Sequence, residues 1–214
     1  GSSVTGSSSV SRSRIYDGGI YAHIVDPFLE HLRRTIVDSV DSKGSVLDVG
    51  CGTGSLVLAL AAKAKSVVGI ELSPKMVAYG RRRLKQAGVS NLTVIEGDVT
   101  ETLKKKADGT FETATMVLVL HELPPDTRGQ VLREVVRLAR RVLCLDYSVP
   151  RPCNMIGLST RLVEMATGSQ HYKAYCDFVN RGGISEIARE SGLSSRKLKL
   201  IHGDAFELVE LYRT

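Results

Sequence analysis

Short apolar runs alternate with longer amphipathic stretches along most of this chain, and no other feature limits its possible folds so strongly. The runs Ser45–Val49 and Val142–Leu145 have the length of buried strands, whereas the stretches between such runs repeat apolar residues at helical spacing. Strand–helix–strand units with short connections pack as a parallel sheet that helices cover on both faces. The sequence therefore predicts a doubly wound α/β fold.

Seven strands are expected in that sheet. They are Ser45–Val49, Val67–Ile70, Leu92–Ile95, Phe111–Leu120, Val142–Leu145, Lys197–His202 and Phe206–Leu211. Because the last two flank a near-hairpin loop, the sheet is expected to be mostly parallel with an antiparallel C-terminal edge strand. Helices are expected from Asp26-Pro27 to the residue before Lys43-Gly44, over Leu56–Ala62, from Ser73-Pro74 to Gly88, from an Asp126 N-cap through Leu138, and over Ile184–Ser191.

Residues 150–180 interrupt this alternation. Two amphipathic stretches, Asn154–Ala166 and Gln170–Val179, follow the fifth strand, and glycines at 168 and 182–183 flank the second. The insertion leaves the sheet at the carboxyl ends of the parallel strands, where open α/β sheets bind ligands. We expect it to form a helical lid of about residues 150–180 that selects the ligand bound there.

Length and charge set the remaining limits. The 214 residues suffice for a single domain over residues 15–214, preceded by a serine-rich tail, residues 1–14, that is expected to be disordered. The net charge is +6, but the basic runs Arg81–Arg83 and Lys104–Lys106 carry no interleaved aromatic residues, so no nucleic-acid partner is expected. No apolar run is long enough to span a bilayer, and no integral membrane contact is expected.

The four cysteines form no C-x-x-C pair and have no zinc-like spacing. No metal is therefore expected, and a reducing, cytoplasmic location is the default. We expect a monomer or a homodimer.

The most informative stretch is Val46-Leu47-Asp48-Val49-Gly50-Cys51-Gly52-Thr53-Gly54. A glycine turn after a strand lets a ligand approach the main chain closely, and the amides at the following helix start favour a carboxylate. The third glycine comes one residue earlier than in the dinucleotide-binding pattern, and no lysine follows to neutralise phosphates. A ligand with a carboxylate and a neighbouring cation would suit these amides together with Asp48.

This stretch resembles motif I of the class I S-adenosylmethionine-dependent methyltransferases, and the resemblance extends through Asp146. It implies a Rossmann-like fold, S-adenosylmethionine as cofactor and methyl transfer as the activity. By the same resemblance, Glu71 accepts from both ribose hydroxyls, Asp98 accepts from the adenine amino group, and Met76 covers the adenine. The cofactor-binding residues implied in this way are Asp48, Gly50, Cys51, Gly52, Thr53, Gly54, Glu71, Leu72, Met76, Asp98, Val99, Val117 and Leu118. Tyr21 precedes the first expected helix and is expected, from that position, to fold over the cofactor.

The acceptor is constrained less tightly. Residues Leu145–Pro150 are similar to the Glu-Phe-Ser-Lys-Pro element of the ubiquinone/menaquinone C-methyltransferases, whereas Gln170–Gly183 matches that group only loosely. The expected acceptor is a small molecule, apolar or aromatic, with quinols among the candidates. Tyr16 and Tyr172 are expected to contact it.

Three residues are candidates for catalysis: His121, Asp146 and His171. A base is needed only if the acceptor loses a proton on methylation. His121 is a possible base, although a histidine at this point also commonly caps or packs a helix start. Two other functions remain open: a nicotinamide-dinucleotide oxidoreductase, and a non-catalytic domain that binds S-adenosylmethionine as a sensor or partner subunit. The early third glycine and Asp98 favour the methyltransferase.

Overall fold

The computed structural model describes residues 19–41, 43–153, 165 and 168–214, with only the backbone of residues 19–28. Its strands are β1 (Ser45–Val49), β2 (Ser66–Glu71), β3 (Leu92–Glu96), β4 (Phe111–Val117), β5 (Ala139–Tyr147), β6 (Leu193–Ile201) and β7 (Phe206–Arg213). Its helices are α1 (Gly19–Ser39), α2 (Ser55–Ala61), α3 (Pro74–Ala87), α4 (Val99–Thr102), α5 (Arg128–Leu138), α7 (Ser169–Asn180) and α8 (Gly183–Glu190).

The strands form one sheet in the order β3-β2-β1-β4-β5-β7-β6. All neighbours from β3 to β5 are parallel, and β7 is antiparallel to both β5 and β6. The predicted doubly wound, mostly parallel sheet is confirmed, with the last strand placed inside the sheet and β6 at its edge. The chain order reverses between β1 and β4, which is the point where such sheets bind ligands.

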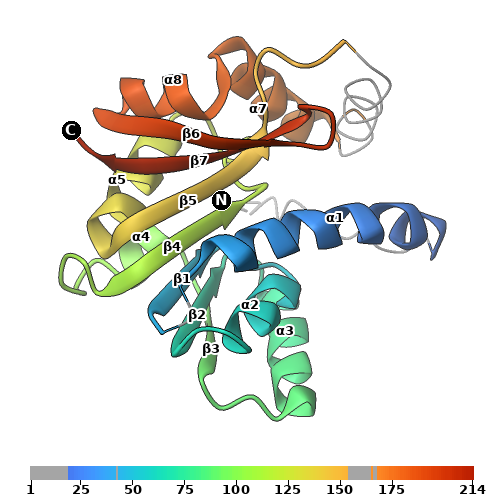
Figure 1. Ribbon diagram of the computed structural model, residues 1–214, viewed down its shortest axis with the longest axis vertical. Helices are drawn as coiled ribbons and strands as arrows, with labels where there is room; N and C mark the ends of the chain where they lie inside the picture. The colour runs from blue at the N-terminus through green and yellow to red at the C-terminus, as the bar shows by residue number, and fades with distance from the viewer. Residues whose placement is uncertain (1–18, 42, 154–164, 166–167) are drawn as a thin grey trace, which may run out of the picture.

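Helices cover both faces of the sheet (Figure 1), with α1, α2 and α3 on one face and α4, α5 and α8 on the other. The central strands are buried on both sides, so β5 is buried at seven of its nine positions. This explains why its sequence is a continuous apolar run rather than an alternating one. One hydrophobic cluster of buried side chains joins the strands to the helices that cover them.

The boundaries of α3 follow its capping residues. The Ser73 hydroxyl accepts a hydrogen bond from the Met76 amide at 3.4 Å, Pro74 occupies the first turn, and Gly88 ends the helix at φ +65°. These are the signals from which the helix was predicted. By contrast, α5 has Thr127 rather than the predicted Asp126 at its N-cap, without a side-chain capping bond. The four-residue helix α4 was not predicted.

The first helix begins earlier than predicted. α1 starts at Gly19, so Asp26-Pro27 lies within it and Tyr21 belongs to the helix instead of preceding it. A proline inside a helix forfeits one main-chain hydrogen bond. The residues before Pro27 continue the helix in spite of that cost. The predicted disordered tail, residues 1–14, lies outside the described residues, as does Tyr16.

The second predicted helix of the insertion is present as α7, whereas the first, residues 154–166, lies outside the described residues except for Met165. Ala174, Tyr175 and Phe178 of α7 are buried, and the helix packs against α8. α7 is therefore part of the hydrophobic core as well as a candidate wall of the site. The glycines at its ends have positive φ, Gly168 at +112° and Gly182 at +92°.

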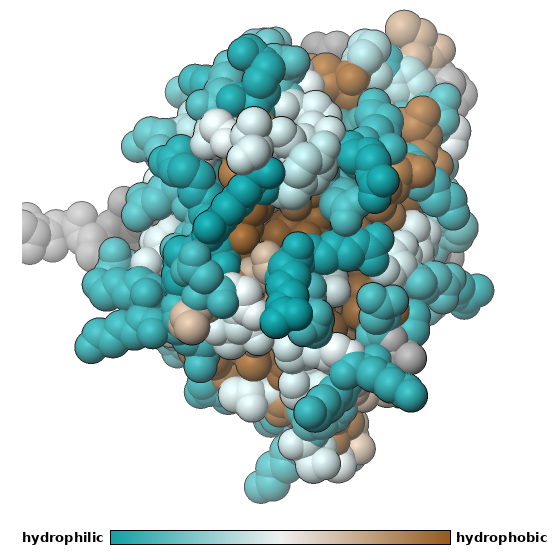
Figure 2. All heavy atoms as spheres, turned by 60° about the vertical axis from the view of Figure 1, so that its left-hand side comes forward, coloured by the Kyte–Doolittle hydropathy of each residue, from teal (hydrophilic) through white to brown (hydrophobic). Residues whose placement is uncertain are grey.

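Hydrophilic side chains cover most of the face shown in Figure 2, with smaller hydrophobic areas between them. Several exposed ion pairs lie on the described surface, such as Arg189 with Glu186 at 2.8 Å. Among the described helices, none has the length and hydrophobicity needed to cross a membrane.

Candidate active site

The glycine turn between β1 and α2 is shaped by three residues with positive φ: Gly50 at +76°, Gly52 at +53° and Gly54 at +85°. A Cβ at Gly50 would lie 2.5 Å from Cγ2 of Val119, so this position excludes any side chain. At Gly52, a Cβ would meet among the described residues only the carbonyl oxygen of Gly50, at 4.0 Å. The turn is therefore packed at Gly50 and open to a ligand at Gly52.

Cys51 lies between these two glycines but turns its side chain into the core. A Cβ added at Gly69 of β2 would lie 2.8 Å from its sulfur. Burial raises the pKa of the Cys51 thiol, and the nearby carboxylates of Asp48 and Glu71 raise it further. The thiol is therefore an unreactive packing group, and Cys51 can contact a cofactor only through its backbone.

Glu71 ends β2 beside the glycine turn and is buried. Its Oε2 accepts the Gly52 amide at 3.0 Å, and its Oε1 accepts the Ser73 amide at 2.9 Å. These two bonds fix the orientation of the carboxylate. This arrangement fits the predicted role of accepting from two ribose hydroxyls. Leu72, the next residue, is a large apolar side chain with 59% of its surface exposed at this edge.

Asp98 and Met76 lie near the ends of β3 and β2, respectively. Oδ1 of Asp98 accepts from both the amide and the hydroxyl of Thr100, at 2.8 and 2.6 Å, and so caps α4. Asp98 is exposed, Val99 is buried, and Met76 is half-buried in the first turn of α3. The capping role and the predicted adenine contact are compatible, because capping occupies one carboxylate oxygen and the side chain faces solvent.

We expect Asp98→Ala to weaken binding of S-adenosylmethionine by about 10- to 150-fold, because a charge-assisted acceptor is worth about 1.5–3 kcal/mol. Calorimetric titration of the purified protein would measure this. Asp98→Asn is the matched variant, because asparagine caps helices as well as aspartate does. Equal affinity of Asp98→Ala and wild type would remove Asp98 from the site.

Asp48 lies in the middle of this region, at the fourth residue of β1. Its Oδ1 accepts the Thr115 hydroxyl of β4 at 2.6 Å, and the residue is 2% exposed. Burial raises the pKa of the carboxyl group to about 7, the bond from Thr115 lowers it, and the charge of Glu71 raises it. An ionised Asp48 is therefore costly in the free protein, and a ligand cation beside it would relieve that cost.

The raised pKa predicts a specific dependence of stability on pH. Because the folded protein favours the protonated carboxyl, the stability contributed by Asp48 is present below its unfolded pKa of 3.8 and is lost as pH rises through about 7. Asp48→Asn should lack this loss and be more stable than wild type by up to about 4 kcal/mol at about pH 8. Urea unfolding of the ligand-free protein at several pH values would test this. A difference that does not change with pH would contradict it.

A histidine–aspartate pair joins the ends of β4 and β5. Nδ1 of His121 lies 2.7 Å from Oδ1 of Asp146, and Oδ2 of Asp146 accepts the His121 amide at 3.1 Å. His121 is 2% exposed and Asp146 is fully buried. Asp146 also accepts the Tyr147 amide, at 2.8 Å. The carboxylate therefore fixes both the ring and the backbone of His121.

The other nitrogen of His121 lies on the side of Glu122 and His171. Its Nε2 is 4.0 Å from Oε1 of Glu122, and the same oxygen is 3.3 Å from Nε2 of His171 on α7. Glu122 and His171 are each about one-quarter exposed. The three predicted catalytic residues are thus brought together, and Glu122 joins them.

The segment that carries His121 is held in an unusual backbone conformation. Leu118 has φ +55°, which costs roughly 1–2 kcal/mol for a residue with a side chain, and its amide donates to the carbonyl of Leu145 at 2.8 Å. Val117 and Leu118 are half-buried where the chain leaves β4. β4 therefore ends three residues earlier than predicted, because Leu118 turns the chain across the carboxyl edge.

Arg128, at the start of α5, connects this segment to α7. Its guanidinium donates to the carbonyls of Leu120 at 3.0 Å and Ala174 at 2.7 Å, and pairs with Asp177 at 2.6 Å. The side chain is 1% exposed. Burial lowers the pKa of this guanidinium, and the charge of Asp177 raises it. Neither Arg128 nor Glu122 was predicted as a site residue, because their partners on α7 are distant along the chain.

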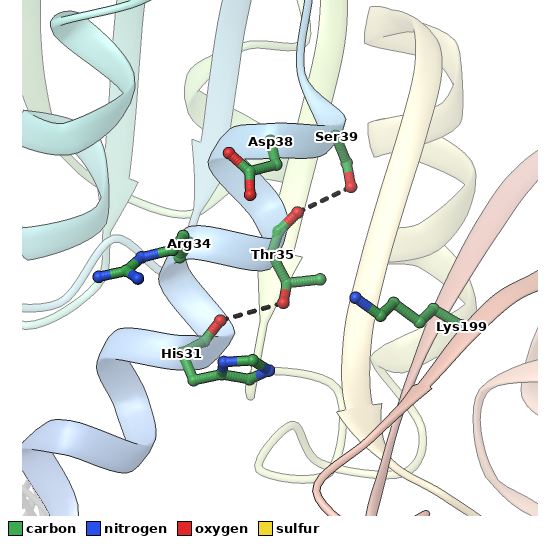
Figure 3. Close-up of a pocket in the computed structure, with 6 residues that line it drawn as sticks. All are labelled: His31, Arg34, Thr35, Asp38, Ser39 and Lys199. Atoms are coloured by element: carbon green, nitrogen blue, oxygen red, sulfur yellow. Dashed lines mark hydrogen bonds between the residues drawn. The ribbon is translucent and has the colours of Figure 1, made fainter.

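A separate cavity of about 190 Å³ lies between the second half of α1 and β6 (Figure 3), lined by His31, Arg34, Thr35, Asp38, Ser39 and Lys199. None of these is a predicted site residue. The Thr35 and Ser39 hydroxyls donate to carbonyls of their own helix, at 3.0 and 2.7 Å. All of its lining residues belong to α1 and β6.

Known proteins resemble this chain over the same region. Residues 46–141 match the family described as "Methyltransferase domain". The demethylmenaquinone methyltransferase of Shouchella clausii is 33% identical over 117 residues, which are 52% of this chain and 48% of that protein. An uncharacterized RNA methyltransferase of Leptospira interrogans is 26% identical over 121 residues, 56% of this chain and 31% of that protein. The chain spans about half the length, or less, of these curated relatives.

Among solved structures, the fold is similar to magnesium protoporphyrin IX methyltransferase from Synechocystis with bound SAH. The TM-score is 0.62 at 20% identity, covering 94% of this chain and 92% of that one. The strand order is that of a Rossmann-like α/β fold. The match of residues 46–141 to a methyltransferase domain and the similarity to known methyltransferases support a class I S-adenosylmethionine-dependent enzyme. The cofactor that these similarities support is S-adenosylmethionine, which the open side of Gly52 and the fixed carboxylate of Glu71 fit.

Proposed function

We propose that this protein transfers the methyl group of S-adenosylmethionine to a small apolar or aromatic acceptor, with quinols among the candidates. The observation that carries this proposal is an aromatic cluster around the buried His121–Asp146 pair. Between ring centroids, His121 lies 4.9 Å from Tyr147 and 6.1 Å from Tyr175, and the centroid of Tyr147 lies 4.9 Å from that of Phe206. These aromatic surroundings of the candidate base favour an apolar or aromatic acceptor over a strongly polar one.

Tyr172 stands at the outer side of this cluster. It is half-buried on α7, and its ring lies 6.2 Å from that of Tyr175. Since Tyr175 is fully buried, Tyr172 is the member of the pair that can reach a ligand. We therefore assign it the acceptor contact that the sequence predicted.

The bound cofactor supplies a methyl group already activated by its sulfonium, so that the protein contributes mainly positioning. Glu71, Asp98 and the Gly52 main chain would hold the nucleoside, and Asp48 would face the cationic amino group of the methionyl part. We assign the removal of a proton from an acceptor hydroxyl to the three groups on this side of the site, His121, Glu122 and His171. The names of two similar proteins, for demethylmenaquinone and for magnesium protoporphyrin IX, support an acceptor with a conjugated ring system.

The test is an assay for the demethylated cofactor with a panel of quinols, phenols, amines, thiols and RNA. Turnover is expected with quinols or phenols. Tyr172→Ala should raise the KM for that acceptor by about 10-fold while leaving cofactor affinity unchanged, as expected for the loss of an aromatic contact. Tyr79→Ala, at an exposed tyrosine of α3, is the control. Turnover confined to amines, thiols or RNA would refute the proposed acceptor class.

The two other hypotheses predict different results. An oxidoreductase would bind a nicotinamide dinucleotide more tightly than S-adenosylmethionine, whereas the early third glycine and Asp98 favour the reverse. A sensor or partner domain would bind S-adenosylmethionine without turnover on any acceptor. Calorimetry and the acceptor panel distinguish all three.

A further inference from the structure

We propose that His121, Glu122 and His171 bind a divalent transition-metal ion at the acceptor side of the site. The ligand atoms are Nε2 of both histidines and a carboxylate oxygen of Glu122. This departs from the sequence analysis, which predicted no metal. His121 and Glu122 are adjacent in the turn after β4, whereas His171 lies on α7. Spacing along the sequence therefore does not indicate this set of metal ligands.

The positions of the three ligand atoms carry the proposal. They all lie within 4.8 Å of one another. The Glu122–His171 separation is 3.3 Å, and the His121–Glu122 separation is 4.0 Å. Tetrahedral zinc with bonds of about 2.1 Å spaces its ligands by roughly 3.4 Å. The Glu122–His171 separation already has about this value. A small rotation of the side chains of Glu122 and His171, which are partly exposed, would bring their ligand atoms to a similar distance from Nε2 of His121.

Asp146 supplies a second, independent feature of metal sites. A histidine that binds a metal usually donates its other ring nitrogen to a carboxylate, which fixes the tautomer and the ring orientation. Here Nδ1 of His121 lies 2.7 Å from Asp146, whose oxygens also accept two backbone amides. With the proton on Nδ1, the lone pair of Nε2 is directed away from Asp146, on the side of Glu122.

The chemistry of the ligands selects the ion. Two imidazoles and one carboxylate suit Zn²⁺, Co²⁺, Ni²⁺ or Fe²⁺ better than Mg²⁺ or Ca²⁺, which prefer oxygen ligands. Three protein ligands leave at least one coordination position for an exogenous oxygen, as in catalytic sites. That this oxygen belongs to the acceptor rests on the proposed function, but binding of the ion does not.

The test is titration of the chelator-treated full chain with Co²⁺ and Zn²⁺, under reducing conditions that keep the cysteines as thiols. We expect one ion per chain by calorimetry and a visible Co²⁺ spectrum of low coordination number. Glu122→Gln and His171→Ala, both at partly exposed positions, should each weaken binding by at least about 10-fold, and Asp146→Asn by about 10- to 100-fold. His31→Ala, at an exposed histidine of α1, is the matched control and should bind as wild type does.

Two results would overturn the metal site: no stoichiometric ion, or equal affinity in wild type, Glu122→Gln and His171→Ala. In the first case Glu122 and His171 form only an ion pair. Methyl transfer by a metal-free protein with wild-type folding would leave the proposed function standing and show that the bound ion takes no part in the reaction. Stoichiometric binding of the ion without turnover on any acceptor would leave the metal site standing and contradict the proposed function.

Discussion

Replacing Arg128 with methionine should lower the free energy of unfolding by about 3 kcal/mol or more, because the change leaves buried carbonyls without a donor. The guanidinium is the shared donor for the carbonyls of Leu120 and Ala174, which belong to the segment after β4 and to α7. Its loss should also loosen His171 relative to Glu122. Urea unfolding measures the first effect.

Arg189→Met is the control for this prediction. Arg189 forms an exposed ion pair with Glu186 within α8, and such pairs contribute less than about 1 kcal/mol. If both arginine variants are equally mild, Arg128 does not hold α7 to the core. Methionine keeps the unbranched stem of the side chain, so the variant loses mainly the guanidinium group and its hydrogen bonds.

Replacing Gly52 with valine should weaken binding of S-adenosylmethionine by at least about 100-fold, or more than about 2.7 kcal/mol. The side chain would fill the open side of the turn, where we expect the cofactor to approach the main chain, and φ of +53° is unfavourable for a β-branched residue. Calorimetric titration measures the loss. A variant that folds and binds normally would show that the cofactor does not pass this glycine.

Gly88→Val is the control that separates the effect of backbone strain from that of a side chain blocking the cofactor. Gly88 has φ +65° at the end of α3, and a Cβ there would meet no described atom within 4 Å. It therefore carries a similar backbone penalty in a position remote from the turn. Stability should fall in both variants, but cofactor affinity only in Gly52→Val.

Features of this protein that depend on neighbouring residues were predictable from the sequence. The glycine turn, the Ser73 and Gly88 caps, Glu71 at the end of β2 and Asp98 just after β3 are encoded within a few positions each. The existence of the strands was predictable from the apolar runs in the sequence. The predicted boundaries of the helices and strands were less accurate. Asp26-Pro27, for example, is a strong local signal for a helix start, yet it lies inside the longer helix α1.

Features that depend on distant contacts were not predictable. Arg128 follows an ordinary helix start, and its burial results from carbonyls supplied by Leu120 and Ala174. Glu122 meets His171 only because α7 packs over the carboxyl edge. Likewise, the apolar side of α7 indicated a lid, but the burial of Tyr175 and Phe178 makes the helix part of the core.

The position of β7 has a consequence for synthesis on the ribosome. β7 follows β6 in the chain but lies between β5 and β6, so the exposed edge of β5 has no partner until residues 206–213 have left the exit tunnel. An unpaired hydrophobic strand edge invites intermolecular pairing. We expect nascent chains stalled before β7 to need chaperones and to aggregate when released, whereas chains that include β7 close the sheet in one late step.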